Sequence, residues 1–192
     1  MKKFTLIIFT LFILLPAKSD MLVKPILEGN KKAKIKIIIY ESLTCGHCAD
    51  FHKNVYPLLK ENYIDTGLAY IEFKSFPLDL AALNASKLAH CKNDGKSQVL
   101  HLLYKEQNNW IKGNTIEDLN LNLKNIVNKE KLGLDFEKCI NNKNIEDYVL
   151  EDRIEGIKKF KVNATPTIII NDEKFEKPLT FKNLKKFLEK LV

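Results

Sequence analysis

The sequence has few cysteines, almost no arginine and only one long apolar run. Four cysteines in 192 residues are too few for a small scaffold held together by disulfides, and a chain of this length can bury a core without them. With 45% hydrophobic and 29% charged residues, the chain is too apolar for intrinsic disorder. We therefore expect one compact globular unit, in which the cysteines need a chemical or a local structural explanation.

The scarcity of arginine bears on the basic charge of the chain. Arg153 is the only arginine, and the lysines are interspersed with Asp and Glu. Nucleic-acid surfaces usually cluster basic residues and often use arginine for bidentate contacts. The formal net charge of +7 therefore indicates a solvated lysine surface, and we expect no nucleic-acid partner.

The one long apolar run, residues 4–15, lies at the N-terminus. It follows two lysines and precedes Pro16 and a small-residue pattern that ends at Ser19, which is the order of a secretory signal peptide. The run is shorter than the ~20 residues of a membrane-spanning helix. We expect cleavage after about Ser19 and export to the periplasm, where disulfides persist. Without residues 1–19 the net charge falls to about +4.

The apolar patterns alternate between strands and helices. Short β-branched or alternating segments predict strands at 35–40, 68–76 and 167–170, with a hairpin partner at 173–176. Helical spacing occurs at 46–63, 80–91, 97–110, 117–132, 145–160 and 180–191, with Pro57 expected to kink or divide the first of these helices and Thr180 to cap the last. This order predicts an α/β fold with a mixed sheet and helices on its faces.

The strongest chemical signal is Cys45-Gly46-His47-Cys48, where a predicted strand ends and a helix begins. Unpaired N–H groups and the positive end of the helix dipole favour a thiolate at the first residue of such a helix. His47 can add positive charge or a hydrogen bond. We therefore expect Cys45 to be an exposed nucleophile of low pKa and Cys48 to be the shielded partner. A stabilised thiolate makes the disulfide form a good oxidant.

The alternative for this motif is half of a zinc or copper site. A structural zinc site usually needs a second closely spaced pair of ligands, whereas the other two cysteines are isolated. His52 follows Cys48 by four residues and is a candidate third ligand, although a lone helix histidine is more often a surface residue. We favour redox chemistry and expect no bound metal.

Cys91 and Cys139 lie in the predicted helical region between the second and third strands. In an oxidising compartment two leftover cysteines most simply pair with each other. The alternative is two free buried thiols. We favour a structural disulfide, and we treat His90 and His101, which have no identifiable partner in the sequence, as structural.

A second signal is Thr165-Pro166 immediately before the strand at 167–170. A proline that opens a strand is ordinary, because its missing N–H costs nothing there. Beside an oxidising CxxC motif, however, the pair resembles the cis-proline loop of the thioredoxin superfamily. A cis bond would turn the Thr165 backbone outward to pair with an extended substrate.

Three segments carry a resemblance that covers nearly the whole chain after the signal: YESLTCGHCADFH, YIDTGLAYIEFKSFPLD and VNATPTIIIND. In this order, with a helical block between the last two, they resemble the bacterial DsbA-type thiol-disulfide oxidoreductases. The resemblance implies a thioredoxin-like fold whose core comprises 20–78 and 161–192, with an all-helical insertion at 79–160. It also implies an oxidase without a cofactor, which donates its disulfide to exported proteins and is reoxidised by a DsbB-type membrane partner.

By position in the family pattern, Cys45 is the attacking cysteine, Cys48 its partner and His47 the histidine between them, while Thr165 and Pro166 form the substrate-side loop. Two features depart from the pattern. Gly46-His47 replaces the family's Pro-His and resembles the pair in eukaryotic disulfide isomerases, which leaves the oxidising strength open. Many relatives also carry an acid six residues before the first cysteine, where this chain has Ile39.

Glu41, two residues after Ile39, lies on the same face of the predicted strand. It is a candidate buried proton acceptor for Cys48, and the alternative is an exposed carboxylate at the end of the strand.

Three other functions are alternatives to an oxidase. An isomerase or reductase would use the same site, but secreted isomerases commonly dimerise through an added N-terminal domain, and only about fifteen residues separate the predicted signal peptide from the first predicted strand here. We therefore expect a monomer. A metal carrier would use Cys45, Cys48 and His52. A holdase for unfolded exported chains would not need the thiols.

Overall fold

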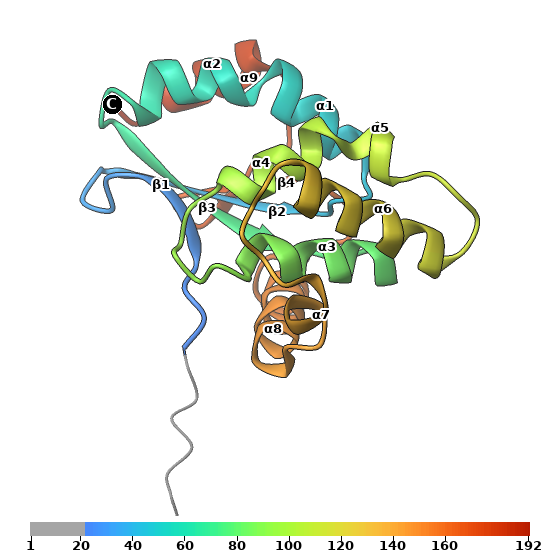
Figure 1. The fold of residues 1–192 in the computed structure, drawn as a ribbon. Helices are drawn as coiled ribbons and strands as arrows, with labels where there is room; N and C mark the ends of the chain where they lie inside the picture. Colours follow the sequence, from blue (N-terminus) through green and yellow to red (C-terminus); the bar gives the residue numbers. More distant parts are fainter. Residues whose placement is uncertain (1–21) are drawn as a thin grey trace, which may run out of the picture.

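The computed structural model describes residues 22–192. The predicted signal peptide, 1–19, lies outside the described residues. A mixed sheet forms the centre of the molecule (Figure 1), with the strand order β1-β3-β2-β4-β5. Its strands are β1 (Ile26–Gly29), β2 (Ile35–Glu41), β3 (Ala69–Ser75), β4 (Thr167–Ile170) and β5 (Glu173–Lys174). Strands β2 and β3 are parallel, and the other neighbours are antiparallel.

The sheet confirms the predicted α/β class, and its central strand shows why. Strand β2 pairs with β3 on one side and β4 on the other, and its side chains are packed on both faces of the sheet. Ile37 and Ile39 pack into the larger hydrophobic cluster, while Ile38 and Tyr40 pack into a second cluster on the opposite face. Strand β3 instead alternates buried with partly exposed positions along its length.

Helices cover both faces of the sheet (Figure 1), with α1, α2 and α9 on one side and α8 on the other. Their bounds are α1 (Gly46–Asn54), α2 (Tyr56–Leu59), α3 (Leu80–His90), α4 (Gln98–Lys105), α5 (Gln107–Trp110), α6 (Ile116–Lys129), α7 (Phe136–Ile140), α8 (Lys143–Phe160) and α9 (Phe181–Leu188), with a π-helical turn, η1 (Lys60–Ile64), after α2. Among the described residues, no helix is long and apolar enough to cross a membrane.

Local sequence signals explain several of these boundaries. Pro57 lies in the first turn of α2, where its missing N–H costs little, so the long helix predicted at 46–63 is divided as expected. Thr180 caps α9 by accepting a hydrogen bond from the backbone N–H of Asn183. The segment 79–160, predicted as a helical insertion, contains α3 to α8 and no strand.

The structure differs from the sequence prediction at short elements. Strand β1 pairs antiparallel with β3, but its four residues, ILEG, are too few to show a period of two. Helix α7 has only five residues and is missing from the prediction for the same reason. The helix predicted at 97–110 is divided at Glu106, and the hairpin partner predicted at 173–176 is reduced to the two residues of β5.

Candidate active site

The CxxC motif lies at the junction of β2 and α1, where the sequence predicts it. Cys45 is the N-cap of α1 with an extended backbone, and Cys48 is completely buried one turn later. The buried Gln107 side chain holds this junction, because its Nε2 donates to the carbonyl oxygens of Leu43 at 2.8 Å and Cys45 at 3.1 Å. The sequence gives no signal for this role of Gln107, which comes from α5, 62 positions after Cys45.

The two thiols are both free in this structure, and their pKa values are shifted in opposite directions. A hydrogen bond from the Cys48 thiol is the largest cause that lowers the pKa of Cys45 from 9.0 to about 5. Burial acts in the other direction but is outweighed by this bond together with the Thr165 side chain and the backbone N–H groups of Cys48 and His47. Burial, followed by the bond to Cys45 and the charge of Glu41, raises the pKa of Cys48 far above its usual range. This is the arrangement expected from the sequence.

His47 is exposed at the first turn of α1. The contact that lowers the Cys45 pKa comes from its backbone N–H, which is part of the helix N-terminus. The structure therefore places the residue where the sequence predicts it, with the main chain as the group that faces the sulfur.

Thr165 and Pro166 lie beside the motif although they are far away in the sequence. The peptide bond between them is cis, and the Cys45 Sγ atom donates a hydrogen bond to the Thr165 carbonyl oxygen at 3.3 Å. A groove of about 630 Å³ opens next to this contact. Side chains from α1, the cis-proline loop and the start of α9 line it: His47, Asp50, Phe51, Asn54, Val55, Thr165, Pro166, Leu179, Thr180 and Phe181.

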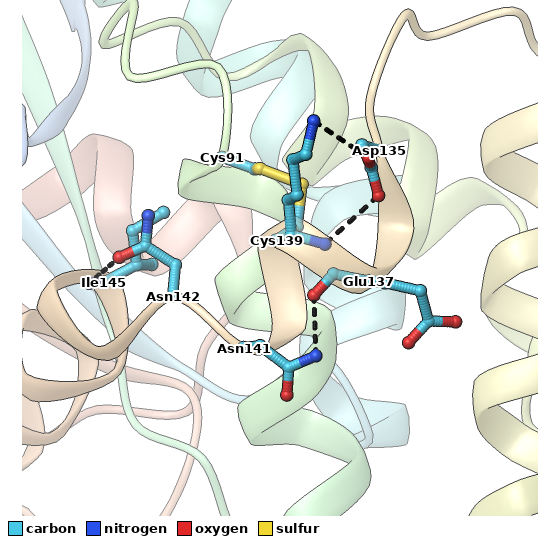
Figure 2. The surroundings of a disulfide bond; sticks show 8 residues. Cys91, Asp135, Glu137, Cys139, Asn141, Asn142 and Ile145 are labelled. Carbon is cyan, nitrogen blue, oxygen red and sulfur yellow. Dashed lines mark hydrogen bonds and ion pairs between the residues drawn. A yellow bond between two sulfur atoms is a disulfide. The ribbon is translucent and has the colours of Figure 1, made fainter.

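Cys91 and Cys139 form a disulfide with a Cα–Cα distance of 5.4 Å, the pairing expected from the sequence. Figure 2 shows that it joins the end of α3 to α7. Asp135 caps α7 by accepting from the backbone N–H of Lys138, and Asn142 caps the following helix through Ile145. The bond therefore ties α7, a helix of only five residues, to the end of α3.

The burial of Glu41 decides between its two interpretations. Glu41 is 3% exposed, so the alternative of an exposed strand-end carboxylate is wrong. Its Oε2 atom lies 2.7 Å from Nε2 of His52. His52 is also buried, at 9% exposure, so its interpretation as a surface residue is wrong as well.

Both ring nitrogens of His52 have partners, because Nδ1 lies 3.1 Å from Nδ1 of His101. The metal-carrier alternative needs a free nitrogen at this position. Within residues 22–192, no three His, Cys, Asp or Glu side chains are arranged to hold a metal ion together. His101, treated as structural from the sequence, continues the contact to Glu28, with its Nε2 atom 2.6 Å from Oε1. The local signal for His52 is that it follows Cys48 by one helical turn and so shares its face of α1.

Comparison with known proteins agrees with this geometry. The thioredoxin family matches residues 22–190. The crystal structure of Wolbachia pipientis alpha-DsbA1 superposes with a TM-score of 0.78 at 34% identity and covers 93% of each chain. A probable disulfide bond formation protein D from Bacillus anthracis is 30% identical over 84% of this chain and 76% of its own length.

A putative protein-disulfide oxidoreductase from Rickettsia bellii is 32% identical over 74% of this chain. The match spans 55% of the length of that relative. BdbD from Bacillus subtilis, at 19% identity and a TM-score of 0.72, shares the fold. From the CxxC motif, the cis-proline loop and these matches together, we conclude that the chain belongs to the thioredoxin superfamily and, within it, to the DsbA-like thiol-disulfide oxidoreductases.

Proposed function

We propose that this chain is a periplasmic oxidase that donates the Cys45–Cys48 disulfide to exported proteins with free thiols. The observation that carries the proposal is the contrast between the two sulfurs. Cys45 is partly exposed with a pKa of about 5, whereas Cys48 is fully buried with a raised pKa. A stable Cys45 thiolate favours the reduced form, so the disulfide form is oxidising.

The reaction begins when a substrate thiolate attacks the Cys45 sulfur in the disulfide. A bond forms between substrate and Cys45, the Cys45–Cys48 bond breaks, and its electron pair goes to Cys48, which takes up a proton. A second substrate thiol then loses its proton and attacks the substrate sulfur of this mixed disulfide. Cys45 leaves as a thiolate, and the substrate is oxidised by two electrons. Cys48 gains one proton and the second substrate thiol loses one, so no net proton is released once the first substrate thiol has ionised.

The substrate is an extended or unfolded segment that lies along the Thr165-Pro166 loop. Support comes from the Thr165 carbonyl at the nucleophile and from the adjoining groove, which is large enough for side chains of a peptide. A backbone carbonyl beside the reacting sulfur can pair with the main chain of substrates that differ in sequence.

The remaining parts of the proposal concern location and partners. The signal peptide predicted at residues 1–19 supports export to the periplasm. Because each turnover leaves reduced thiols, the oxidase needs an electron acceptor, for which we propose a DsbB-type membrane protein. The protein itself acts as a monomer and uses no cofactor. Light scattering of the mature protein tests the oligomeric state, and loss of the oxidised form in cells without the acceptor tests the partner.

The test is oxidation of a reduced, unfolded model protein by the purified mature chain in its disulfide form. We expect stoichiometric transfer of one disulfide, loss of transfer in Cys45→Ser, and a trapped mixed disulfide when reduced Cys48→Ala meets an oxidised substrate. Activity that survives Cys45→Ser would instead indicate a holdase. Metal that copurifies with the reduced protein at one equivalent would indicate a carrier.

One observation favours isomerase activity as a second candidate, namely the Gly46-His47 pair between the cysteines. Glycine at the first helical position loosens that turn, which lowers the stabilisation of the thiolate. The reduction potential, measured by equilibration with glutathione, separates the two functions. An oxidase requires a potential well above that of glutathione, and rescue of a scrambled disulfide substrate would favour the isomerase.

A further inference from the structure

Four buried or half-buried side chains form an unbroken chain of hydrogen bonds beside Cys48. They are Glu41 at the end of β2, His52 in α1, His101 in α4 and Glu28 in β1. The three successive distances are 2.7 Å from Glu41 to His52, 3.1 Å between the two Nδ1 atoms, and 2.6 Å from His101 to Glu28. We call these four residues the relay.

The geometry of the relay fixes how many protons it holds. Each histidine turns its Nε2 atom to a carboxylate and its Nδ1 atom to the other histidine. Three hydrogen bonds need three hydrogens, but two neutral imidazole rings supply only two. When all three contacts are hydrogen bonds, the relay therefore holds one proton more than two neutral rings and two carboxylates, which gives a total charge of −1. Moving the hydrogens along the three bonds transfers this proton from one end to the other.

The inner end of the relay lies at the resolving cysteine. Cys48 and Glu41 are both buried, and the charge of Glu41 is among the causes that raise the pKa of Cys48. The Oε1 atom of Glu41 is buried and has no hydrogen-bond partner within residues 22–192. This atom is available to pass a proton to a sulfur on the same side of the sheet.

The outer end of the relay reaches solvent. The His101 side chain is 27% exposed, and together with His52 it lines a groove of about 620 Å³ between α1 and α4. Glu28 accepts further hydrogen bonds from Tyr56 and Ser97. Burial raises the pKa of Glu28, but the bonds from His101, Ser97 and Tyr56 outweigh it and hold this pKa at about 2. Glu28 therefore remains an ionised acceptor that orients His101.

We propose that the relay carries a proton between the groove and Cys48 each time the Cys45–Cys48 disulfide opens or closes. This inference rests on the proposed oxidase function. When the disulfide opens, the electron pair of the broken bond goes to the Cys48 sulfur, and Glu41 delivers the proton that converts it to a thiol. Loss of this proton leaves the relay one hydrogen short, and its outer end, where the His101 side chain is partly exposed, regains a proton from water in the groove. Closure of the disulfide returns a proton from Cys48 to Glu41 and releases one from the outer end to the groove.

Without such a path a buried thiolate would form at Cys48 in a place that strongly disfavours charge.

Other ionisable groups face the relay from the elements packed around it, and their titration also contributes to the pH dependence of the rate. Tyr104 of α4 stacks on His52 with ring centroids 4.0 Å apart. The groove is also lined by Asp50, Lys53 and Tyr56 from α1 and α2 and by Lys105 from α4.

The test measures the rate at which a small thiol, reduced glutathione, opens the disulfide of the oxidised mature protein. The rate is divided by the concentration of glutathione thiolate at each pH between about 5 and 8. Positioned proton transfer typically contributes 10²-fold or more, so we expect His101→Ala to slow opening by at least about tenfold. Because His101 borders the groove, added imidazole should enter the space left by the side chain and restore the rate. The restored rate should follow the imidazolium concentration.

His52→Gln should show the same slowing with much weaker rescue, because the His52 side chain is only 5% exposed, against 27% for that of His101. His90→Gln is the matched control, since His90 is an equally buried histidine outside the relay, and we expect its rate to match that of the wild type. Circular dichroism establishes that each variant folds, and the exposed position of His101 makes it the deciding variant if His52→Gln unfolds. Opening in His101→Ala within twofold of the wild type, or no response to imidazole, would overturn the relay. Loss of disulfide transfer from the wild type itself would instead overturn the oxidase function.

Discussion

The Sγ atom of Cys45 lies 3.3 Å from the carbonyl oxygen of Thr165, a residue 120 positions later in the chain. A thiol can donate to this oxygen, whereas a thiolate cannot. When Cys45 ionises, the carbonyl therefore loses its internal partner and becomes available to a backbone N–H of the substrate. The contact therefore couples the ionisation of Cys45 to the availability of the Thr165 carbonyl for a substrate N–H.

The first prediction concerns the stability of the reduced protein. The pKa of Cys45 falls from 9.0 to about 5 on folding, so ionised Cys45 stabilises the fold fully above pH 9 and loses this effect as the pH falls through 5. Between pH 9 and pH 5 the free energy of unfolding should decrease by about 1 kcal/mol for each unit by which the pH falls. Urea unfolding of the reduced protein, compared with Cys45→Ser from pH 8 to 5, measures the difference. Parallel curves for the two proteins would contradict it.

The second prediction concerns the source of the low pKa. The hydrogen bond from Cys48 is the largest cause that lowers the Cys45 pKa, and a hydrogen bond to a charged group is worth about 1.5–3 kcal/mol. Cys48→Ala should therefore raise the Cys45 pKa by about 1–2 units. The ultraviolet absorbance of the thiolate during a pH titration measures this. Cys48→Ser, which keeps a hydroxyl donor, is the matched control and should give a smaller rise.

The third prediction concerns Gln107, which holds the turn before α1. Its side chain is 6% exposed and donates to two carbonyl oxygens, so Gln107→Leu removes both hydrogen bonds. The Cys45 carbonyl keeps two backbone N–H donors, whereas that of Leu43 loses its Gln107 donor. We expect a loss of about 1–3 kcal/mol in the free energy of unfolding and slower alkylation of Cys45 at pH 6. Asn109→Ala removes an exposed amide from the same helix and should change neither quantity. Equal effects of the two substitutions would show that Gln107 has no special role.

The parts of the site that the sequence predicts are those encoded by neighbours in the chain. The position of Cys45 and Cys48 follows from four consecutive residues between a strand and a helix. The loop at Thr165 is predicted from a proline that opens a strand in a chain that also carries a CxxC motif. The longer strands and helices are predicted equally well, because each has enough residues to show its period.

The relay could not be predicted in this way. His52 and His101 are 49 positions apart, and His101 and Glu28 are 73 apart, so their contacts depend on how α1 and α4 pack against β1. Nothing local distinguishes His101 from a structural histidine. Glu28 also lies in β1, a strand too short to be recognised from its pattern.

The fourth prediction concerns the disulfide in the helical region. Cys91 and Cys139 are 48 positions apart, and closing a loop of this length in the unfolded chain is worth ~4 kcal/mol in the entropy model. The double variant Cys91→Ala/Cys139→Ala should lose an amount of this order in urea unfolding, while Cys45 keeps its low pKa. Mass spectrometry after alkylation of the native protein provides the control, and labelling of both cysteines would show that the bond is absent.

The fifth prediction concerns the contact between α8 and the sheet. A Cβ atom at Gly156 would lie 2.8 Å from Cε1 of Tyr40, closer than the two carbons can approach. The Tyr40 ring cannot move away easily, because it is fully buried and packs against Phe76 and Phe160.

Glycine to alanine in a helix normally gains up to about 1 kcal/mol, but overpacking a core costs about 1–3 kcal/mol. Because the strain at Tyr40 exceeds the gain in helix propensity, Gly156→Ala should lower the free energy of unfolding. Lys158→Ala, at an exposed position of the same helix, is the matched control and should have almost no effect. If thermal unfolding showed Gly156→Ala to be more stable than the wild type, α8 would not pack on the sheet as closely as this contact requires.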